Sequence, residues 1–224
     1  MKKILAFAVV AVAALSLAGA KGITLGAHGY LGEGWGASYY ENDSNYTKPF
    51  GENLYFGGGA FVNVGLKGAL FVQPELNYYV NNIGRKSSVT FLGTTTTTVT
   101  KYTYNSIDVP VLFGYKYKNF SLVAGPYISF PVSSLNYQSV ISSGSSSSTT
   151  SGEVSKITGV TFGFTGGLEY ETRLGPGKMI LGARYLHDFN PIKNVTTDDS
   201  GNSTTTNYFY RGAAELDLGY KISL

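Results

Sequence analysis

Several segments of the chain alternate between apolar and polar residues, and the charged residues of each segment fall on one parity. Between Ile107 and Tyr117, for example, the odd-numbered residues are aliphatic or aromatic, whereas Asp108 and Lys116 are even-numbered. A period of two places successive side chains on opposite faces of a β-strand. The pattern therefore predicts strands that each have one apolar face and one polar face.

Eight segments with this pattern are predicted to be strands, and the connections between them alternate in length. The connections after the second, fourth and sixth segments are very short, whereas the other four are long and polar. Outer-membrane barrels have short periplasmic turns and long external loops, so this alternation favours eight strands with both termini on the periplasmic side. The predicted strands cover residues 22–39, 53–66, 69–82, 100–117, 120–133, 157–173, 178–189 and 207–224.

The composition indicates which face points outward. Charged residues make up only 14% of the chain, whereas a soluble surface normally carries about 25–35%. The apolar face has no charge across the central stretch of the second to eighth strands, as expected where a charge at mid-bilayer costs roughly 2–4 kcal/mol. We predict an all-β fold, an eight-stranded antiparallel transmembrane up-and-down β-barrel. A soluble lipocalin-like barrel with the faces reversed is the alternative.

Aromatic residues gather near the ends of the predicted strands, as in the girdles that meet lipid headgroups in such barrels. Tyr117, Phe120 and Tyr220 would form the girdle on the side of the short turns. Pro74 and Pro126 lie inside predicted strands and each lacks a ladder donor, so we expect them at bulges or near an interface. The girdle expected on the side of the long connections contains Tyr39, Tyr78, Tyr102, Tyr104, Tyr185, Tyr208 and Tyr210.

Residues 1–20 resemble a secretory signal peptide. Lys2 and Lys3 form the positive start, residues 4–17 form the apolar run, and Ala18-Gly19-Ala20 supplies the small residues of a cleavage site. We expect cleavage after Ala20 and a barrel domain over residues 21–224. An uncleaved membrane helix is the alternative, and the absence of cysteine excludes disulfides and thiolate metal sites.

The polar face would line the barrel interior. An eight-stranded barrel is just wide enough to be filled by side chains, and buried charges must be paired. We therefore expect the inward acids and bases to form a plug of ion pairs, in which arginines neutralise the neighbouring Glu169 and Glu171; a proton or ion path is the alternative. The candidate residues of this lumen charge network are Glu75, Asp108, Lys116, Glu169, Glu171, Arg173, Arg184, Arg211, Glu215 and Asp217.

Two of the long connections contain low-complexity tracts, at residues 94–98 and 142–151. Tracts of serine and threonine bury too little apolar surface to order themselves. We expect both to be exposed and mobile.

No constellation of residues indicates catalysis, a cofactor or a metal. The chain has two histidines; His28 is expected to face inward, and His187 to lie on the outward parity near the long-loop rim while Asp188 points to the opposite face. A hydrolase triad needs a shared geometry that this arrangement does not supply. The net charge of +3 is too small to suggest nucleic acid. We predict no catalytic, cofactor-binding or metal-binding residues.

Three motifs resemble the PorT-like family of outer-membrane β-barrels. They are Gln73–Tyr78 (QPELNY), Ile107–Tyr117 (IDVPVLFGYKY) and Phe120–Phe130 (FSLVAGPYISF). The resemblance implies an eight-stranded barrel in a Gram-negative-type outer membrane and no single activity. Such barrels typically end in an aromatic residue that the assembly machinery reads, whereas this chain ends in Leu224, with Tyr220 and Ile222 in phase.

These inferences predict an integral outer-membrane protein with a structural or surface-interaction role, carried by its long external loops. The expected partners are outer-membrane lipids and lipopolysaccharide, the barrel assembly machinery through the C-terminal strand, and ligands on other surfaces; we expect a monomer. The alternatives are a narrow pore or small-solute carrier, and a lipid-A-modifying enzyme.

Overall fold

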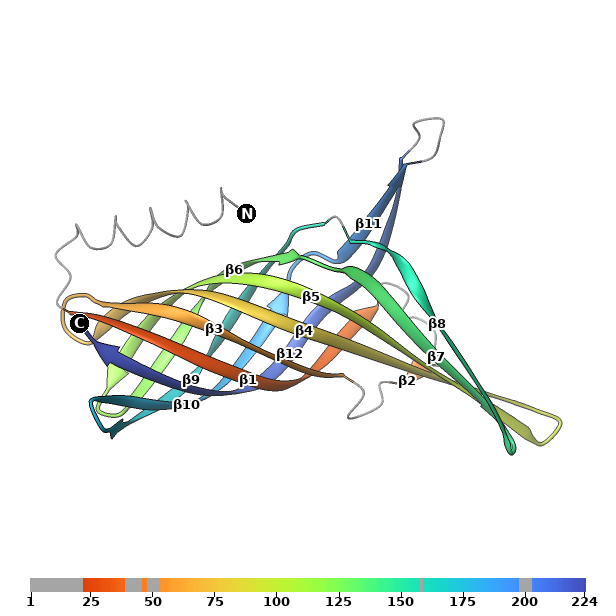
Figure 1. Ribbon diagram of the computed structural model, residues 1–224, viewed down its shortest axis with the longest axis horizontal. Coiled ribbons are helices and arrows are strands. Elements are labelled where there is room, and N and C mark those ends of the chain that lie inside the picture. Colours follow the sequence, from red (N-terminus) through yellow and green to blue (C-terminus); the bar gives the residue numbers. More distant parts are fainter. Residues whose placement is uncertain (1–21, 39–45, 48–52, 158, 198–202) are drawn as a thin grey trace.

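The computed structural model describes residues 22–38, 46–47, 53–157, 159–197 and 203–224. The predicted signal peptide and Tyr39 lie outside the described residues. The described chain is built from antiparallel strands (Figure 1). None of its residues forms a helix long and apolar enough to cross a membrane.

Eight strands form a closed ring. Each pairs with the ring strand before and after it in the sequence, and the last pairs with the first. The predicted eight antiparallel strands are confirmed as the strands of this ring, and the described residues form four further strands within segments expected to be loops. The ring strands are β1 (Ile23–Ser38), β3 (Leu54–Gly65), β4 (Leu70–Phe91), β5 (Thr94–Tyr117), β6 (Phe120–Pro131), β9 (Thr161–Leu174), β10 (Gly177–Asp188) and β12 (Ser203–Ser223).

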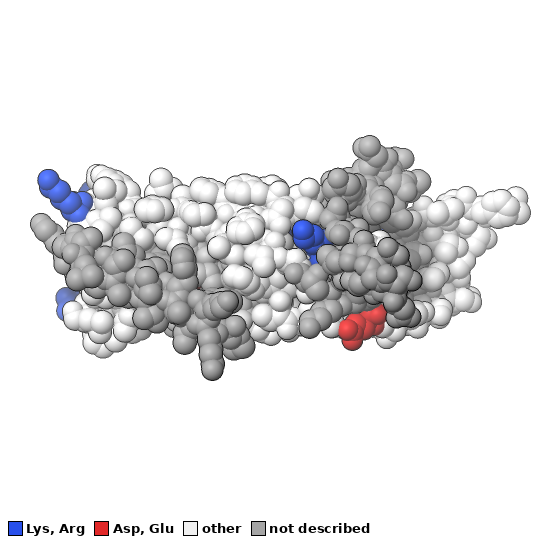
Figure 2. All heavy atoms as spheres, turned by 90° about the horizontal axis from the view of Figure 1, so that it is seen from above, with Lys and Arg blue, Asp and Glu red and all other residues white. Residues whose placement is uncertain are grey.

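The two faces of the ring have opposite chemistry. Large apolar side chains point outward and are exposed, among them Leu216 (67%), Phe113 (59%) and Leu31 (58%), whereas the inward side chains of the same strands are buried and often polar. A soluble domain buries its aliphatic residues instead, so the lipocalin-like arrangement of the faces is wrong. Figure 2 shows basic side chains at the left end of the molecule and charged side chains to the right of its middle. The described residues that are visible between them are uncharged.

Short turns close one end of the ring, which we call the turn end. Gly68 between β3 and β4 (φ 74°) and Gly175 between β9 and β10 (φ 58°) adopt the left-handed conformation that glycine permits without strain. Ile23 and Ser223, at the start of β1 and the end of β12, lie at the same end.

At the opposite end β4 and β5 continue far beyond the ring and carry additional strands. β2 (Tyr46–Thr47) pairs with β4, β7 (Ser134–Ser143) pairs with β5, and β8 (Ser146–Lys156) pairs with β7. We call this sheet of β2, β4, β5, β7 and β8 the arm; it projects to the right in Figure 1. β11 (Ile192–Thr197) pairs with the outer part of β12 as a separate extension.

The arm corrects the expectation that residues 94–98 and 142–151 are mobile. Residues 94–98 lie in β5, and residues 142–151 form a hairpin of β7 and β8 with its turn at residues 144–145; Thr90 pairs with Thr95, and Thr97 pairs with Ser142. Threonine favours strands, and its hydroxyls form cross-strand bonds such as that between Thr90 Oγ1 and Thr95 Oγ1, at 2.9 Å. The expected exposure is confirmed for residues 94–95 and 144–151, whereas residues 96–98 and 142–143 are half-buried.

Two expectations also need correction: a bulge at either proline, and the girdle position of Tyr104. The register is identical on both sides of Pro74 and Pro126, so neither residue forms a bulge; the missing N–H interrupts the ladder without shifting it. Tyr104 is only 1% exposed and lies in an inward apolar cluster rather than in a girdle. Tyr78 and Tyr185 are exposed on the outward face as expected.

Close packing inside the ring depends on glycine at Gly114 of β5. A Cβ at this position would lie 2.0 Å from the ring of Phe71, which is buried. We expect Gly114→Ala to lower the free energy of unfolding by about 1–3 kcal/mol, because overpacking forces neighbours to move. Urea titration in detergent measures it. Gly29→Ala is the matched control, since its nearest neighbour would lie at 3.8 Å; equal stability of both variants would contradict the expectation.

Candidate functional site

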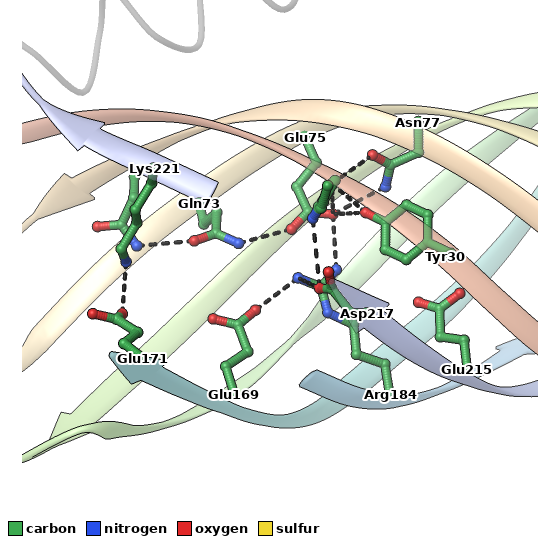
Figure 3. A network of polar contacts seen from close by, with 12 residues as sticks. Tyr30, Gln73, Glu75, Asn77, Glu169, Glu171, Arg184, Glu215, Asp217 and Lys221 are labelled. Atoms are coloured by element: carbon green, nitrogen blue, oxygen red, sulfur yellow. Dashed lines mark hydrogen bonds and ion pairs between the residues drawn. The ribbon is translucent and has the colours of Figure 1, made fainter. Parts of the chain in front are cut away.

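The inward side chains form layers of polar contacts along the ring. In the middle layer the guanidinium of Arg184 (β10) meets three carboxylates. Its Nη1 donates to Glu75 Oε2 at 2.9 Å and its Nη2 donates to Glu169 Oε1 at 2.7 Å, while Asp217 Oδ2 lies 3.2 Å from Nη2 (Figure 3). All four residues are at most 4% exposed.

His28 (β1) belongs to the same middle layer. Its Nε2 lies 3.1 Å from Asn77 Oδ1 and is hydrogen-bonded to the hydroxyl of Tyr30, and its Nδ1 lies 3.5 Å from Asp217 Oδ2. The carboxyl of Asp217 thus lies between the imidazole and Arg184. The sequence expectation that His28 faces inward is correct.

Glu215 (β12) is held by tyrosines. Tyr55 donates to Glu215 Oε2 at 2.8 Å and Tyr79 donates to the same oxygen at 3.3 Å. No base of the described residues lies within ion-pair distance of this carboxyl.

A second layer lies toward the arm. Arg211 Nη2 (β12) donates to Asp108 Oδ2 (β5) at 2.7 Å and to Asp188 Oδ1 (β10) at 3.5 Å. Ser129 donates to Asp108 Oδ1 and Tyr127 donates to Asp188 Oδ1, each at 2.5 Å, and the backbone N–H of Arg211 donates to Asp188 Oδ2 at 3.2 Å. Beyond this layer an apolar cluster of Ile83, Tyr104, Leu135, Ile157 and Ile192 covers the interior.

The layer at the turn end is basic. Glu171 (β9) accepts a hydrogen bond from Lys221 at 2.6 Å and another from Lys116, and Lys178 lies 3.5 Å away. Arg173 is exposed and forms no ion pair with the described residues.

Two of these contacts span the ring. In an eight-stranded ring, strands four positions apart are opposite, and β4 and β10 have this relation, as do β5 and β12. The Arg184–Glu75 and Arg211–Asp108 pairs join them. Charged side chains therefore cross the interior at two levels and connect opposite walls.

Eight of the ten residues that the sequence nominated form ion pairs, in three separate layers rather than in one network, and a ninth, Glu215, accepts hydrogen bonds from Tyr55 and Tyr79. Arg173 is the exception, and the arginines expected to neutralise Glu171 are replaced by lysines. The sequence prediction did not include Lys178, although its even parity matches that of Arg184. It also overlooked the phenols of Tyr55, Tyr79 and Tyr127.

No described group has the geometry of a hydrolytic site. His187 points outward between Tyr185 and Phe189, with ring centroids 6.4 and 6.3 Å away. Asp188 points inward to Arg211, so the two neighbours cannot act together. Among the described residues no group of three histidine or acidic side chains is placed to hold a metal ion.

Comparison with known proteins agrees with this architecture. A family model described as an outer membrane protein beta-barrel domain matches residues 20–194. A search of curated proteins found no match.

Several solved structures are similar in fold at low sequence identity. Neisserial surface protein A is 14% identical, with a TM-score of 0.41 over 91% of this chain and 98% of that chain. Ail, the attachment invasion locus protein of Yersinia pestis, is 13% identical, with a TM-score of 0.39 over 90% and 99%. A major outer membrane protein from Thermus thermophilus is 12% identical, with a TM-score of 0.47 over 90% and 99%.

Proposed function

This chain belongs to the family of outer membrane protein beta-barrel domains, and from that premise we propose that its ring is an eight-stranded transmembrane up-and-down β-barrel. The outward apolar side chains would face lipid, where charges are costly. Ring closure pairs the strand edges, which a bilayer requires because its core offers no water to backbone groups. The layers of ion pairs would fill the lumen.

The orientation follows from the unequal ends. Short turns and both termini would lie in the periplasm, and the arm would project outside the cell. The proposal includes a signal peptide over residues 1–20 that is cleaved after Ala20, a barrel domain over 21–224 and insertion by the assembly machinery through β12. Within the family we place the chain with the PorT-like barrels, as a monomer surrounded by phospholipid and lipopolysaccharide.

We infer a surface-interaction role for the arm, and one observation carries this inference. β8 pairs only with β7 among the described strands, so its other edge presents unpaired backbone groups. An exposed edge is normally protected by charges or proline. The part of β8 from Ser146 to Gly152 contains neither, whereas Glu153 and Lys156 lie at the base of the hairpin. Extended segments of partners bind such edges by adding a strand.

Deleting residues 139–151 should weaken this interaction while the barrel still folds. The deletion removes the paired outer part of the β7–β8 hairpin and leaves the Asn136–Glu153 pair at its base. We expect bacteria that carry the deletion to adhere to cultured cell layers about tenfold less well, a difference of ~1.4 kcal/mol. Counts of adherent bacteria, at matched surface levels of protein, measure this.

A variant with Ser147→Thr and Ser148→Thr is the matched control, since it alters side chains while keeping the strand edge. It should adhere like the wild type if backbone groups are recognised. Adherence that survives the deletion, or wild-type bacteria that adhere no better than bacteria lacking the protein, would refute the role.

The alternatives rank lower for structural reasons. A narrow pore or carrier needs an open path, whereas two arginine–carboxylate pairs cross the interior of the ring. Single-channel current steps in a planar bilayer would favour the pore over the surface-interaction role. A lipid-A-modifying enzyme would need a catalytic group on the outer rim, where His187 lies between the rings of Tyr185 and Phe189 and pairs with no acid among the described residues. We propose a non-enzymatic protein.

A further inference from the structure

The turn end of the ring contains a basic cavity of about 330 Å³. Lys116, Lys178, Lys221 and Arg173 line it together with Glu171. In Figure 3 Lys221 and Glu171 lie at the left, apart from the Arg184 layer. The ion pairs of that middle layer do not reach the cavity.

The charges in this cavity are unbalanced. Four basic side chains share it with a single carboxylate, so three positive charges lack a counter-ion among its lining residues. Glu171 is the innermost of these groups: its side chain is 3% exposed, whereas those of Lys116 and Lys178 are 32% and 47% exposed. The acid holds the ammonium groups close together, and the cavity remains open to solvent.

The cavity also has unused hydrogen-bond donors. Each lysine ammonium has three donors and directs one toward Glu171. Thr24 also lines the cavity, and its hydroxyl is buried without a hydrogen-bond partner among the described residues. Several donors that converge from different strands match an anion with several oxygens, and charge-assisted bonds of this kind are the strong ones.

We propose that the turn end binds a phosphate group. A phosphate carries up to about two negative charges and three or more acceptor oxygens, so it can meet the three uncompensated cations together. The group could belong to a phospholipid headgroup or to a soluble phosphate. That the cavity faces the periplasm rests on the proposed membrane orientation, whereas phosphate binding does not.

The first test titrates inorganic phosphate into the full-length mature chain, refolded in a zwitterionic detergent without a phosphate group. We expect saturable binding by calorimetry. The double variant Lys116→Gln/Lys178→Gln should raise Kd at least about tenfold, a loss of ~1.4 kcal/mol. Lys118→Gln is the matched control, because Lys118 is exposed beside Tyr117 in the β5–β6 turn and does not line the cavity.

Arg173→Gln gives an independent variant if the double variant does not fold, since Arg173 forms no ion pair with the described residues. It should weaken binding while leaving the unfolding midpoint of the free protein unchanged. If Arg173→Gln and Lys118→Gln raised the Kd for phosphate equally, binding would depend only on the net charge of the protein. That result would refute the proposed site.

A second arm distinguishes the sources of the phosphate group. Vesicles of a neutral glycolipid, with or without phosphatidylglycerol, replace the detergent. A lipid site predicts that phosphatidylglycerol raises the unfolding midpoint of the wild type and not of the lysine variant; a soluble-ligand site predicts calorimetric binding without that shift. Absence of both effects would overturn the proposal and leave the role of the arm untouched.

Discussion

Arg184→Met is expected to destabilise the folded protein by about 3–5 kcal/mol, the cost of removing one partner from a buried ion pair. Arg184 is 4% exposed and is the only base within 4 Å of Glu169 among the described residues. Its loss leaves Glu75, Glu169 and Asp217 together in the interior, with His28 as the remaining basic neighbour. Methionine fills part of the space, so the effect reports mainly on charge.

Urea titration of the refolded protein measures this loss, with band position on gels of unheated samples as the signal for the folded state. Arg173→Met is the control and should change stability by less than about 1 kcal/mol, as exposed charges do. Adding Glu75→Gln and Glu169→Gln to Arg184→Met should restore part of the stability, because the uncompensated charges are then removed. A stability loss shared equally by Arg173→Met and Arg184→Met would refute the assigned role of Arg184.

The strands and their faces could be predicted because alternation is a local property. The parity of Asp108 and Arg211 placed both inside, but these residues are 103 positions apart in the chain. Their contact follows from ring closure and register, which place β5 opposite β12. The sequence therefore identified the inward charges and not their partners.

The misassigned residues lie where a local pattern competes with tertiary pairing. Tyr104 shares the even parity of Asp108, and parity alone would have placed it inside; its position near a strand end suggested a girdle instead. Residues 94–98 have no apolar alternation, yet they form a strand because β4 continues alongside and supplies the partner. Composition identifies such a tract as exposed but contains no information on its pairing.

Leu216→Arg should separate a membrane barrel from a soluble one. Leu216 points outward at 67% exposure, and its neighbours Leu31 and Ala183 lie midway along β1 and β10. In a bilayer an arginine near the midplane costs roughly 2–4 kcal/mol. In a soluble barrel the same surface substitution would change stability by about 0.5 kcal/mol or less.

The measurement is reversible urea unfolding of the protein inserted in lipid vesicles. Leu174→Arg is the depth control, because Leu174 is exposed at the turn end of β9, where an arginine should cost about 0–1 kcal/mol. The two substitutions should differ in their cost in stability only if lipid surrounds the middle of the ring. In water, arginine at the exposed Leu216 and arginine at the exposed Leu174 would have similar small effects. Equal effects of the two substitutions would remove the membrane assignment, and with it the orientation that places the arm outside and the basic cavity in the periplasm.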